Sequence, residues 1–414
     1  MRFSTTLSAA ALTIGLCAPL AGVPAAHAAQ SCDGLRATIV GTNRADRIVG
    51  TDKRDVIVAR GGNDVIRGGG GNDVICAGDG ADTVHGGDGH DRIFGQGDAY
   101  WADSYGRARR RGDMLSGGAG NDHLDPGADP RPVSPGVKAV PDGVTYADAP
   151  NPLVVDLRSL TASAGANGVD TIVPNPTGMR VVATPHADTV VGTQGPDTIW
   201  AGAGDDRVNA QNGDDTVHAD NGASVGNDRV LGSVGDDTIS GAVGYDSFLG
   251  GPGADTLTTS APTRTELRGG TGADTVAFPL PTESGWVVNG EKGEDRLRLL
   301  PGANPALVPT VRIDQRAGTI AVRGLVPVTV LGKLRGFNDV QLPAGASVKY
   351  FGSNESEIIT AHPLHGIRVK ARGGADVVNG SRRDDWVDGG PGFDIVRGKG
   401  GKDTCRRAER RSSC

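Results

Sequence analysis

Hydrophobic residues recur along this chain in a fixed relation to aspartate, and not with the period of an amphipathic helix. From Gly41 onward the sequence reads GTNRADRIV, GTDKRDVIV, ARGGNDVIR, GGGGNDVIC, AGDGADTVH and GGDGHDRIF, with Asp at the sixth place of every nine residues. An aliphatic residue follows two places after each Asp. The last three residues of each unit alternate around that apolar side chain, which predicts a very short strand with one side chain turned inward.

The first six residues of each unit predict a turn. They are rich in Gly, which adopts positive φ at little cost, and they end in Asp, which favours turns. Turn, strand, turn and strand make a coil of 18 residues, twice the repeat length. Stacked coils form a parallel β-roll, so we expect an all-β chain, a β-solenoid with a narrow core of stacked aliphatic side chains.

The repeat aspartates fall into three arrays, and more than half of the 42 Asp residues occupy this one position. The first array contains Asp46, Asp55, Asp64, Asp73, Asp82, Asp91, Asp113 and Asp122. The second contains Asp188, Asp197, Asp206, Asp215, Asp228, Asp237, Asp246 and Asp255, with Asp274 and Asp295 as looser members. The third contains Asp376, Asp385, Asp394 and Asp403, after a weak unit at Glu357.

The arrays suggest the organisation of the chain. We place the three rolls at residues 29–125, 183–298 and 352–405. Residues 126–182 begin as a Pro-rich linker and continue as metal-free coils, and residues 299–351 form divergent metal-free β coils. Each of these two segments is alternatively a small separate β domain. Residues 406–414 form a basic tail.

The N-terminus predicts secretion. Arg2 precedes an apolar stretch at residues 7–20, and a small-residue cleavage site follows at residues 26–28, so residues 1–28 read as a signal peptide. No later stretch approaches 18 apolar residues, so we expect no membrane span. The predicted location is secreted and extracellular.

Four cysteines would remain after cleavage: Cys32, Cys76, Cys405 and Cys414. In an oxidising compartment four cysteines allow three disulfide connectivities. Two lie toward each end of the chain, which favours Cys32–Cys76 and Cys405–Cys414, each fastening one terminus.

Composition excludes several classes of protein. Gly accounts for 66 of 414 residues and aromatic residues for only 4%, while Asp outnumbers Glu by 42 to 7. Asp and Gly favour turns over helices, which disfavours a helical or α/β enzyme. The net charge of −7 argues against a nucleic-acid partner.

Stacked turns suggest a cation site. Coils about 4.8 Å apart would place each repeat Asp over the Asp 18 residues later, so rows of carboxylates would repel one another. A hard divalent cation between turns removes this repulsion. Ca²⁺ accepts six to eight oxygens in irregular geometry and fits better than Mg²⁺, which needs a smaller octahedron.

The unit resembles the RTX, or haemolysin-type, calcium-binding repeat with consensus GGxGxDxUx. Close copies are GGGGNDVIC at 68–76, GGDGHDRIF at 86–94, GGAGNDHLD at 117–125, GGPGADTLT at 250–258 and GGPGFDIVR at 389–397. The resemblance implies a parallel β-roll that binds several Ca²⁺ ions through the Asp and the loop carbonyls, and that folds on binding. Units such as GTNRADRIV, GTDKRDVIV and GSRRDDWVD depart from the consensus.

The resemblance carries the ligand role to the sixth-place Asp of the better-matched units. The candidate metal ligands are Asp55, Asp64, Asp73, Asp82, Asp91, Asp122, Asp197, Asp206, Asp215, Asp237, Asp246, Asp255, Asp274, Asp376, Asp385, Asp394 and Asp403. Tight Asx-type turns without metal are the structural alternative.

We expect a non-enzymatic protein, since the sequence contains no HExxH, G-x-S-x-G or Walker A motif. The predicted role is a surface, matrix or adhesion component, with cell-surface glycans or matrix components as further partners. The alternative is a secreted β-helix enzyme that acts on polysaccharide. A segment at 95–112 places three aromatic residues beside four Arg; it is an exposed turn or, alternatively, a site for an anionic glycan.

Overall fold

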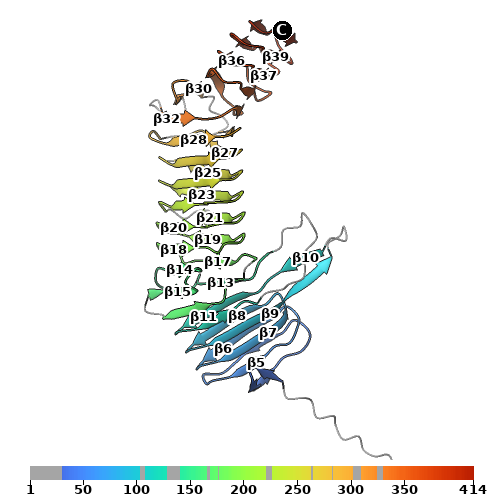
Figure 1. Cartoon of the computed structure of the whole chain (residues 1–414), viewed down its shortest axis with the longest axis vertical. Coiled ribbons are helices and arrows are strands. Elements are labelled where there is room, and N and C mark those ends of the chain that lie inside the picture. The colour runs from blue at the N-terminus through green and yellow to red at the C-terminus, as the bar shows by residue number, and fades with distance from the viewer. Residues whose placement is uncertain are drawn as a thin grey trace, which may run out of the picture.

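The computed structural model describes residues 30–102, 108–127, 140–165, 168–175, 177–220, 226–262, 264–281, 283–301, 309–323 and 330–414. The predicted signal peptide lies outside these residues. The described part contains no α-helix, and its strands form a parallel β-solenoid. Figure 1 shows the coils stacked in chain order along one axis, from β5 (Val56–Val58) to β39 (Ile395–Arg397) near the C-terminus. The predicted fold class is confirmed.

Two long sheets form the opposite walls of the solenoid. We name them sheet 1 and sheet 2. Sheet 2 is parallel throughout. Its strands are β4 (Arg47–Val49), β6 (Val65–Gly70), β8 (Thr83–Asp88), β11 (Met114–Ala119), β13 (Gly143–Thr145), β17 (Arg180–Val182), β19 (Thr198–Gly202), β21 (Thr216–Asp220), β23 (Thr238–Gly244), β25 (Thr256–Pro262), β27 (Thr275–Pro279), β29 (Arg296–Leu300), β33 (Asp339–Gln341), β35 (Ile358–Thr360), β37 (Val377–Asn379), β39 and β41 (Arg410–Ser412).

Sheet 1 holds the alternate strands of the coils. In spatial order they are β3 (Ile39–Val40), β5, β7 (Val74–Gly80), β9 (Arg92–Ala102), β12 (His123–Asp125), β16 (Val169–Ile172), β15 (Thr161–Ser163), β14 (Val154–Asp156), β18 (Thr189–Val191), β20 (Arg207–Asn209), β22 (Arg229–Leu231), β24 (Ser247–Pro252), β26 (Glu266–Thr271), β28 (Val287–Lys292), β32 (Val330–Arg335), β31 (Thr319–Arg323), β30 (Thr310–Asp314), β34 (Ser347–Phe351), β36 (Ile367–Lys370), β38 (Trp386–Asp388) and β40 (Thr404–Arg406). β10 (Ala108–Arg111) forms a hairpin with β9.

Sheet 1 contains two antiparallel excursions between the arrays. β14, β15 and β16 pair as an antiparallel meander, and β30, β31 and β32 do the same further along the chain. The outer strands of each meander pair in parallel with the coils on either side, β12 with β16 and β14 with β18, then β28 with β32 and β30 with β34. The stack of coils therefore continues through both intervening segments.

The core is a column of inward side chains between the sheets. Ile57, Ile75 and Ile93 come from sheet 1, Ile48 and Ile66 from sheet 2, and each is at most 7% exposed. They belong to one cluster that runs along the whole stack to Ala408. Burial of one aliphatic side chain per strand contributes roughly 1.5–3 kcal/mol each, which accumulates over many coils.

The core also contains aromatic residues, which the repeat did not predict. Phe248, Phe278, Trp286 and Tyr350 are fully buried, and the rings of Phe278 and Trp286 meet edge-on with centroids 5.4 Å apart. Phe248 lies in the regular unit of Asp246, whereas Phe278, Trp286 and Tyr350 lie further along, where the unit departs from nine residues.

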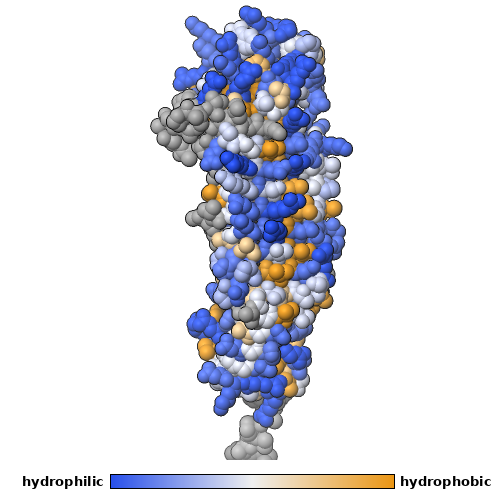
Figure 2. Space-filling model, turned by 90° about the vertical axis from the view of Figure 1, so that its left-hand side faces the viewer, coloured by the Kyte–Doolittle hydropathy of each residue, from blue (hydrophilic) through white to orange (hydrophobic). Residues whose placement is uncertain are grey.

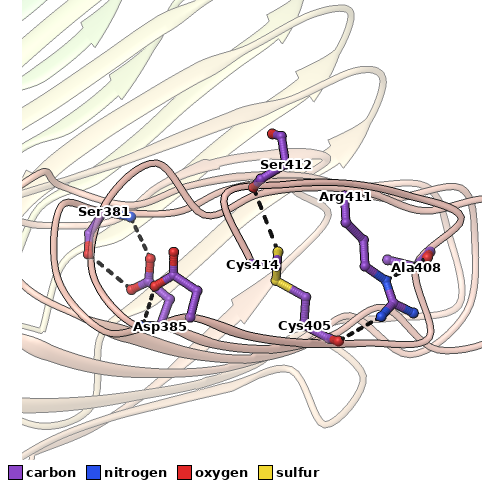
Figure 3. The surroundings of a disulfide bond; sticks show 8 residues. Ser381, Asp385, Cys405, Ala408, Arg411, Ser412 and Cys414 are labelled. Atoms are coloured by element: carbon purple, nitrogen blue, oxygen red, sulfur yellow. Dashed lines mark hydrogen bonds between the residues drawn. A yellow bond between two sulfur atoms is a disulfide. The ribbon is translucent and has the colours of Figure 1, made fainter.

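Disulfides fasten the two ends of the solenoid. Cys32 lies in β1 (Ser31–Cys32), which forms a hairpin with β2 (Leu35–Arg36), and it is bonded to Cys76 in β7. Cys405 in β40 is bonded to Cys414 near the C-terminus (Figure 3). Both predicted pairings are confirmed.

Candidate functional site: the rows of turn carboxylates

The sixth-place aspartates lie one above another at the edges of the solenoid, as the 18-residue coil predicts. The backbone N–H of Asp55 donates to Oδ1 of Asp73 at 2.7 Å, and that of Asp73 donates to Oδ1 of Asp91 at 2.8 Å. The same bond joins Asp197 to Asp215 at 2.7 Å. One carboxylate oxygen of each stacked Asp is therefore committed to the backbone of the preceding coil.

These bonds define six rows of carboxylates, two in each array. In the first array the rows are Asp46, Asp64, Asp82, Asp113 and Asp142, and Asp55, Asp73, Asp91, Asp122 and Asp170. In the second they are Asp188, Asp206, Asp228 and Asp246, and Asp197, Asp215, Asp237, Asp255, Asp274 and Asp295. In the third they are Glu357, Asp376, Asp394 and Glu409, and Asp385 and Asp403.

The second oxygen divides the turns into two kinds. In most turns Oδ2 of the Asp is buried and accepts no hydrogen bond from the described residues. We name these open turns. Their residues are Asp64, Asp73, Asp82, Asp91, Asp113, Asp122, Asp206, Asp215, Asp228, Asp237, Asp246, Asp255, Asp274, Asp295, Asp376, Asp394 and Asp403.

In five other turns the chain itself supplies the partner of Oδ2, and we name these capped turns. Thr193 donates its backbone N–H to Oδ2 of Asp197 at 2.6 Å and its hydroxyl to Oδ1 at 2.8 Å. The Thr193 hydroxyl in turn accepts the N–H of Gly195 at 3.1 Å. Ser381 binds Asp385 in the same way, at 2.7 Å and 3.0 Å (Figure 3).

The capped turns share a Thr or Ser four residues before the acidic residue. The pairs are Thr42 with Asp46, Thr51 with Asp55, Thr184 with Asp188, Thr193 with Asp197 and Ser381 with Asp385. Each of these pairs stands at the start of a row. At the start of the sixth row Ser353 donates its N–H to Oε1 of Glu357 at 2.7 Å, but the buried Oε2 has no hydrogen-bond partner among the described residues. Five of the six rows therefore begin with a carboxylate whose second oxygen the protein itself partners.

Protein groups also close both rows of the first array at the far end. Oδ2 of Asp142 accepts from Nδ2 of Asn175 at 3.1 Å, and Oδ2 of Asp170 accepts from the hydroxyl of Tyr146 at 2.8 Å. The open turns lie between these partnered ends.

Backbone conformation separates the two kinds of turn as well. In open turns the second residue of the unit often has positive φ, as at Gly87 (120°) and Gly251 (121°), and even at Gln211 (82°). At Gly87 an added Cβ would lie 1.9 Å from the carbonyl oxygen of Gly69, one coil earlier. Glycine is needed here because neighbouring coils approach this closely. None of the Thr or Ser residues of the capped turns has positive φ.

Burial and neighbouring charge disfavour ionised carboxylates in the open turns. Burial, followed by the charges of Asp197 and Asp237, raises the pKa of Asp215 to about 9. Burial raises the pKa of Asp82 to about 7 and that of Asp206 to about 8, and neighbouring carboxylates add to both shifts. In the capped turn of Asp55, burial is outweighed by hydrogen bonds from Thr51 and Thr38, which hold the pKa below its usual value.

The donor set of an open turn suits a hard cation. Each open turn offers one buried carboxylate oxygen without a hydrogen-bond partner among the described residues, in a loop of backbone amides and carbonyls with polar side chains such as Asn63 and Asp205. In the described part of the chain, no three His, Cys, Asp or Glu side chains converge on one point, so further ligands to a metal would be backbone carbonyls or water. Oxygen-only ligands and irregular geometry fit Ca²⁺ and not Zn²⁺, which prefers nitrogen and sulfur.

The predicted ligands divide between the two kinds of turn. Three of them, Asp55, Asp197 and Asp385, lie in capped turns, where both carboxylate oxygens already accept hydrogen bonds. The other predicted ligands lie in open turns. Asp113, Asp228 and Asp295 also lie in open turns but were not among the candidates, although each keeps the row register.

The hairpin of β9 and β10 bears on the glycan hypothesis for residues 95–112. Arg110 is buried, and its Nε lies 3.1 Å from Oδ2 of Asp98. Arg110 is therefore engaged within the protein. Tyr105 and Arg107 lie outside the described residues, as do the side chains of Tyr100, Trp101 and Arg109.

Comparison with protein families agrees with this geometry. The family described as RTX calcium-binding nonapeptide repeat (4 copies) matches residues 40–75, 77–99, 110–129, 182–217, 222–257 and 371–405. The chain is thus a protein of RTX calcium-binding nonapeptide repeats, built as a β-solenoid. A comparison with curated proteins finds no match to this chain. Among the described residues, no helix is both long enough and apolar enough to cross a membrane.

Proposed function

We propose that the protein is an extracellular calcium-binding β-roll in which Ca²⁺ is held by the open turns and not by the capped turns. The observation that carries this proposal is the buried Oδ2 without a partner in every open turn, against the same oxygen occupied by Thr or Ser in the capped turns. A bound cation would supply the positive charge that the rows lack.

Repulsion along the rows supports a role for cations. Adjacent carboxylates about 4.8 Å apart repel by roughly 3 kcal/mol at an effective dielectric constant near 20. Protonation relieves this repulsion only below the raised pKa values, which are about 7 for Asp82 and about 6 for Asp237. Above those values the open turns need cations, while the second carboxylate oxygen of a capped turn already accepts a hydrogen bond from Thr or Ser.

Matched substitutions test the division. Asp237→Asn in an open turn should lower the number of bound calcium ions, while Asp197→Asn in a capped turn should leave that number unchanged. The second variant should instead lose about 1 kcal/mol of stability, since a hydrogen bond to a carboxylate is weakened. Bound calcium is counted by isothermal titration calorimetry and native mass spectrometry.

A third variant turns the capped turn into an open one. Thr193→Gly removes the hydroxyl donor and permits positive φ, so the unit GTQGPD becomes GGQGPD. We expect one additional bound calcium ion. Equal losses of calcium in Asp237→Asn and Asp197→Asn, or no gain in Thr193→Gly, would contradict the assignment.

We further propose that the protein acts outside the cell, in a matrix or at a cell surface, and has no catalytic role. Extracellular modules bind calcium with a Kd of about 10⁻⁴–10⁻³ M, so folding would follow export. The predicted signal peptide and the two disulfides support an oxidising compartment. N-terminal sequencing of the exported protein should find Ala29 first, and retention on whole cells should require calcium.

A further inference from the structure

The charge of the molecule is divided unequally along its axis. Residues 1–308 contain 24 Lys and Arg against 38 Asp and Glu, a net charge of −14. Residues 309–414 contain 18 against 11, a net charge of +7. Figure 2 shows hydrophilic side chains over most of the C-terminal end, at the top of the view. An acidic protein thus ends in a basic lobe.

Strand register lines up part of this charge on the outer face of sheet 1. In consecutive strands β30, β34 and β36, Arg312 pairs in register with Lys349, and Lys349 with Arg368. The next position in the column is Trp386 in β38. Arg312, Lys349 and Arg368 are exposed, because inward and outward side chains alternate along each strand. Three cations therefore follow one another at steps of about 4.8 Å.

A second column runs beside the first, and the two enclose a groove. Phe351 in β34 lies in register with Lys370 in β36. The groove has a volume of about 330 Å³. Its lining includes Arg312, Lys349, Phe351, Arg368, Lys370 and Trp386.

Aromatic rings support the cations of this groove. The guanidinium carbon of Arg312 lies 4.1 Å from the centroid of Phe351, and that of Arg368 lies 5.4 Å from Trp386. Nζ of Lys370 lies 6.0 Å from the same indole. A ring beneath a cation orders it and partly offsets repulsion from its neighbours.

Three of these cations have no carboxylate partner among the described residues. Arg312 approaches Asp314, which also pairs with Arg372. No ion pair involves Lys349, Arg368 or Lys370 within the described part of the chain. The groove thus presents ordered positive charge that the protein does not neutralise.

We propose that this groove binds a linear anionic polysaccharide, whose carboxylate or sulfate groups pair with Lys349, Arg368 and Lys370. The inference rests on the proposed role at a surface or in a matrix. A thin chain with regularly spaced charges can follow a column of cations along the solenoid axis. A nucleic-acid duplex would be brought against the acidic coils, and single strands need open aromatic faces, which the cations cover here.

The test compares two triple variants with the wild-type protein in calcium. Lys349→Ala/Arg368→Ala/Lys370→Ala removes the groove cations. Arg67→Ala/Arg207→Ala/Arg229→Ala removes the same charge from exposed arginines on other strands and serves as the control. Binding is measured by calorimetry with octasaccharides of chondroitin sulfate and hyaluronan, with dextran as the neutral probe and a single-stranded DNA 12-mer as the nucleic-acid probe.

We expect both anionic octasaccharides to bind the wild type, with the groove variant weaker by roughly 10-fold or more and the control within about 2-fold. Binding of chondroitin sulfate alone would identify sulfate as the preferred group. The inference is overturned if neither anionic sugar binds, if DNA binds as well as they do, or if the two triple variants behave alike. Circular dichroism of each protein in calcium and in chelator separates these outcomes from a failure of the calcium proposal.

Discussion

Whether an individual turn is open or capped depends on whether a protein group donates a hydrogen bond to the second oxygen of its carboxylate. Thr193 donates hydrogen bonds to both carboxylate oxygens of Asp197, whereas Asp237, in a unit of similar sequence, keeps a buried oxygen without a partner among the described residues. Each hydrogen bond to a charged group contributes about 1.5–3 kcal/mol to stability. A hydroxyl and an amide that donate to the carboxylate can therefore replace much of the stabilisation that a bound cation would give.

The nine-residue spacing predicted the stacked Asp residues of the three arrays, but not Asp142 and Asp170, which continue two rows, and not this division. Thr193 and Ser233 both stand second in their units, and both units have Gly fourth. Thr193 caps its Asp, while Ser233 adopts a φ of 82° and bonds instead to Asn209. The outcome depends on the neighbouring coil, which sequence spacing does not report.

Glycine substitutions test the close approach of the coils at the residue scale. Gly87→Ala should lower the free energy of unfolding by about 2 kcal/mol or more, since a Cβ would meet the backbone of Gly69 and φ is positive. Gly70→Ala is the control, because its nearest neighbour would lie at 3.5 Å. Urea denaturation in calcium measures both. Equal stability of the two variants would contradict the packing described.

At the scale of the element, each row of carboxylates is a unit whose first carboxylate accepts a hydrogen bond from Thr or Ser. Five of the six rows begin at a capped turn, and the first array also ends at carboxylates held by Asn175 and Tyr146. Under the proposed function only the middle of a row depends on cations. We then expect the capped turns to be places where a coil can form before calcium binds.

The pKa values predict how a metal-free row responds to pH. Burial and neighbouring charge raise the pKa of Asp82 to about 7 and that of Asp215 to about 9, above the unfolded value of about 3.9. The folded chain therefore binds more protons than the unfolded chain, and its stability falls as pH rises through this range.

We expect the chelated protein to have a higher urea midpoint near pH 5 than near pH 8, where most open carboxylates would be ionised. Calcium should remove or reverse this trend and release protons on binding, which calorimetry in buffers of different ionisation enthalpy detects. A chelated protein that becomes more stable as pH rises would contradict the description of the open turns.

The described part of the molecule is a single stack of coils in which each strand pairs with those of the neighbouring coils, and the N-terminal hairpin also packs across β5 and β7. Sequence periodicity predicted the parallel β-solenoid and its aliphatic core, because nine-residue spacing fixes which residues face inward and which coils are adjacent. Both disulfides were predicted instead from the two cysteines that lie toward each end of the chain. It did not predict the two antiparallel meanders of sheet 1, since Val154–Asp156 and Thr310–Asp314 alternate like any other strand. In these meanders the direction of each strand depends on its pairing with neighbouring strands of sheet 1.

Calcium is predicted to have its largest effect on the stability of the molecule as a whole. The rows extend over most of the length of the solenoid, and each open turn bridges two coils through its Oδ1 contact. Cations bound at neighbouring turns therefore stabilise the same interface, and binding should be cooperative.

The most direct test is far-UV circular dichroism of residues 29–414 during a calcium titration that starts from the chelated protein near neutral pH. We predict a steep, cooperative gain of β signal that magnesium does not reproduce and that chelator reverses. A full β spectrum in chelator, unchanged by added calcium, would mean that the open turns are stable without metal and would contradict the calcium-dependent roll.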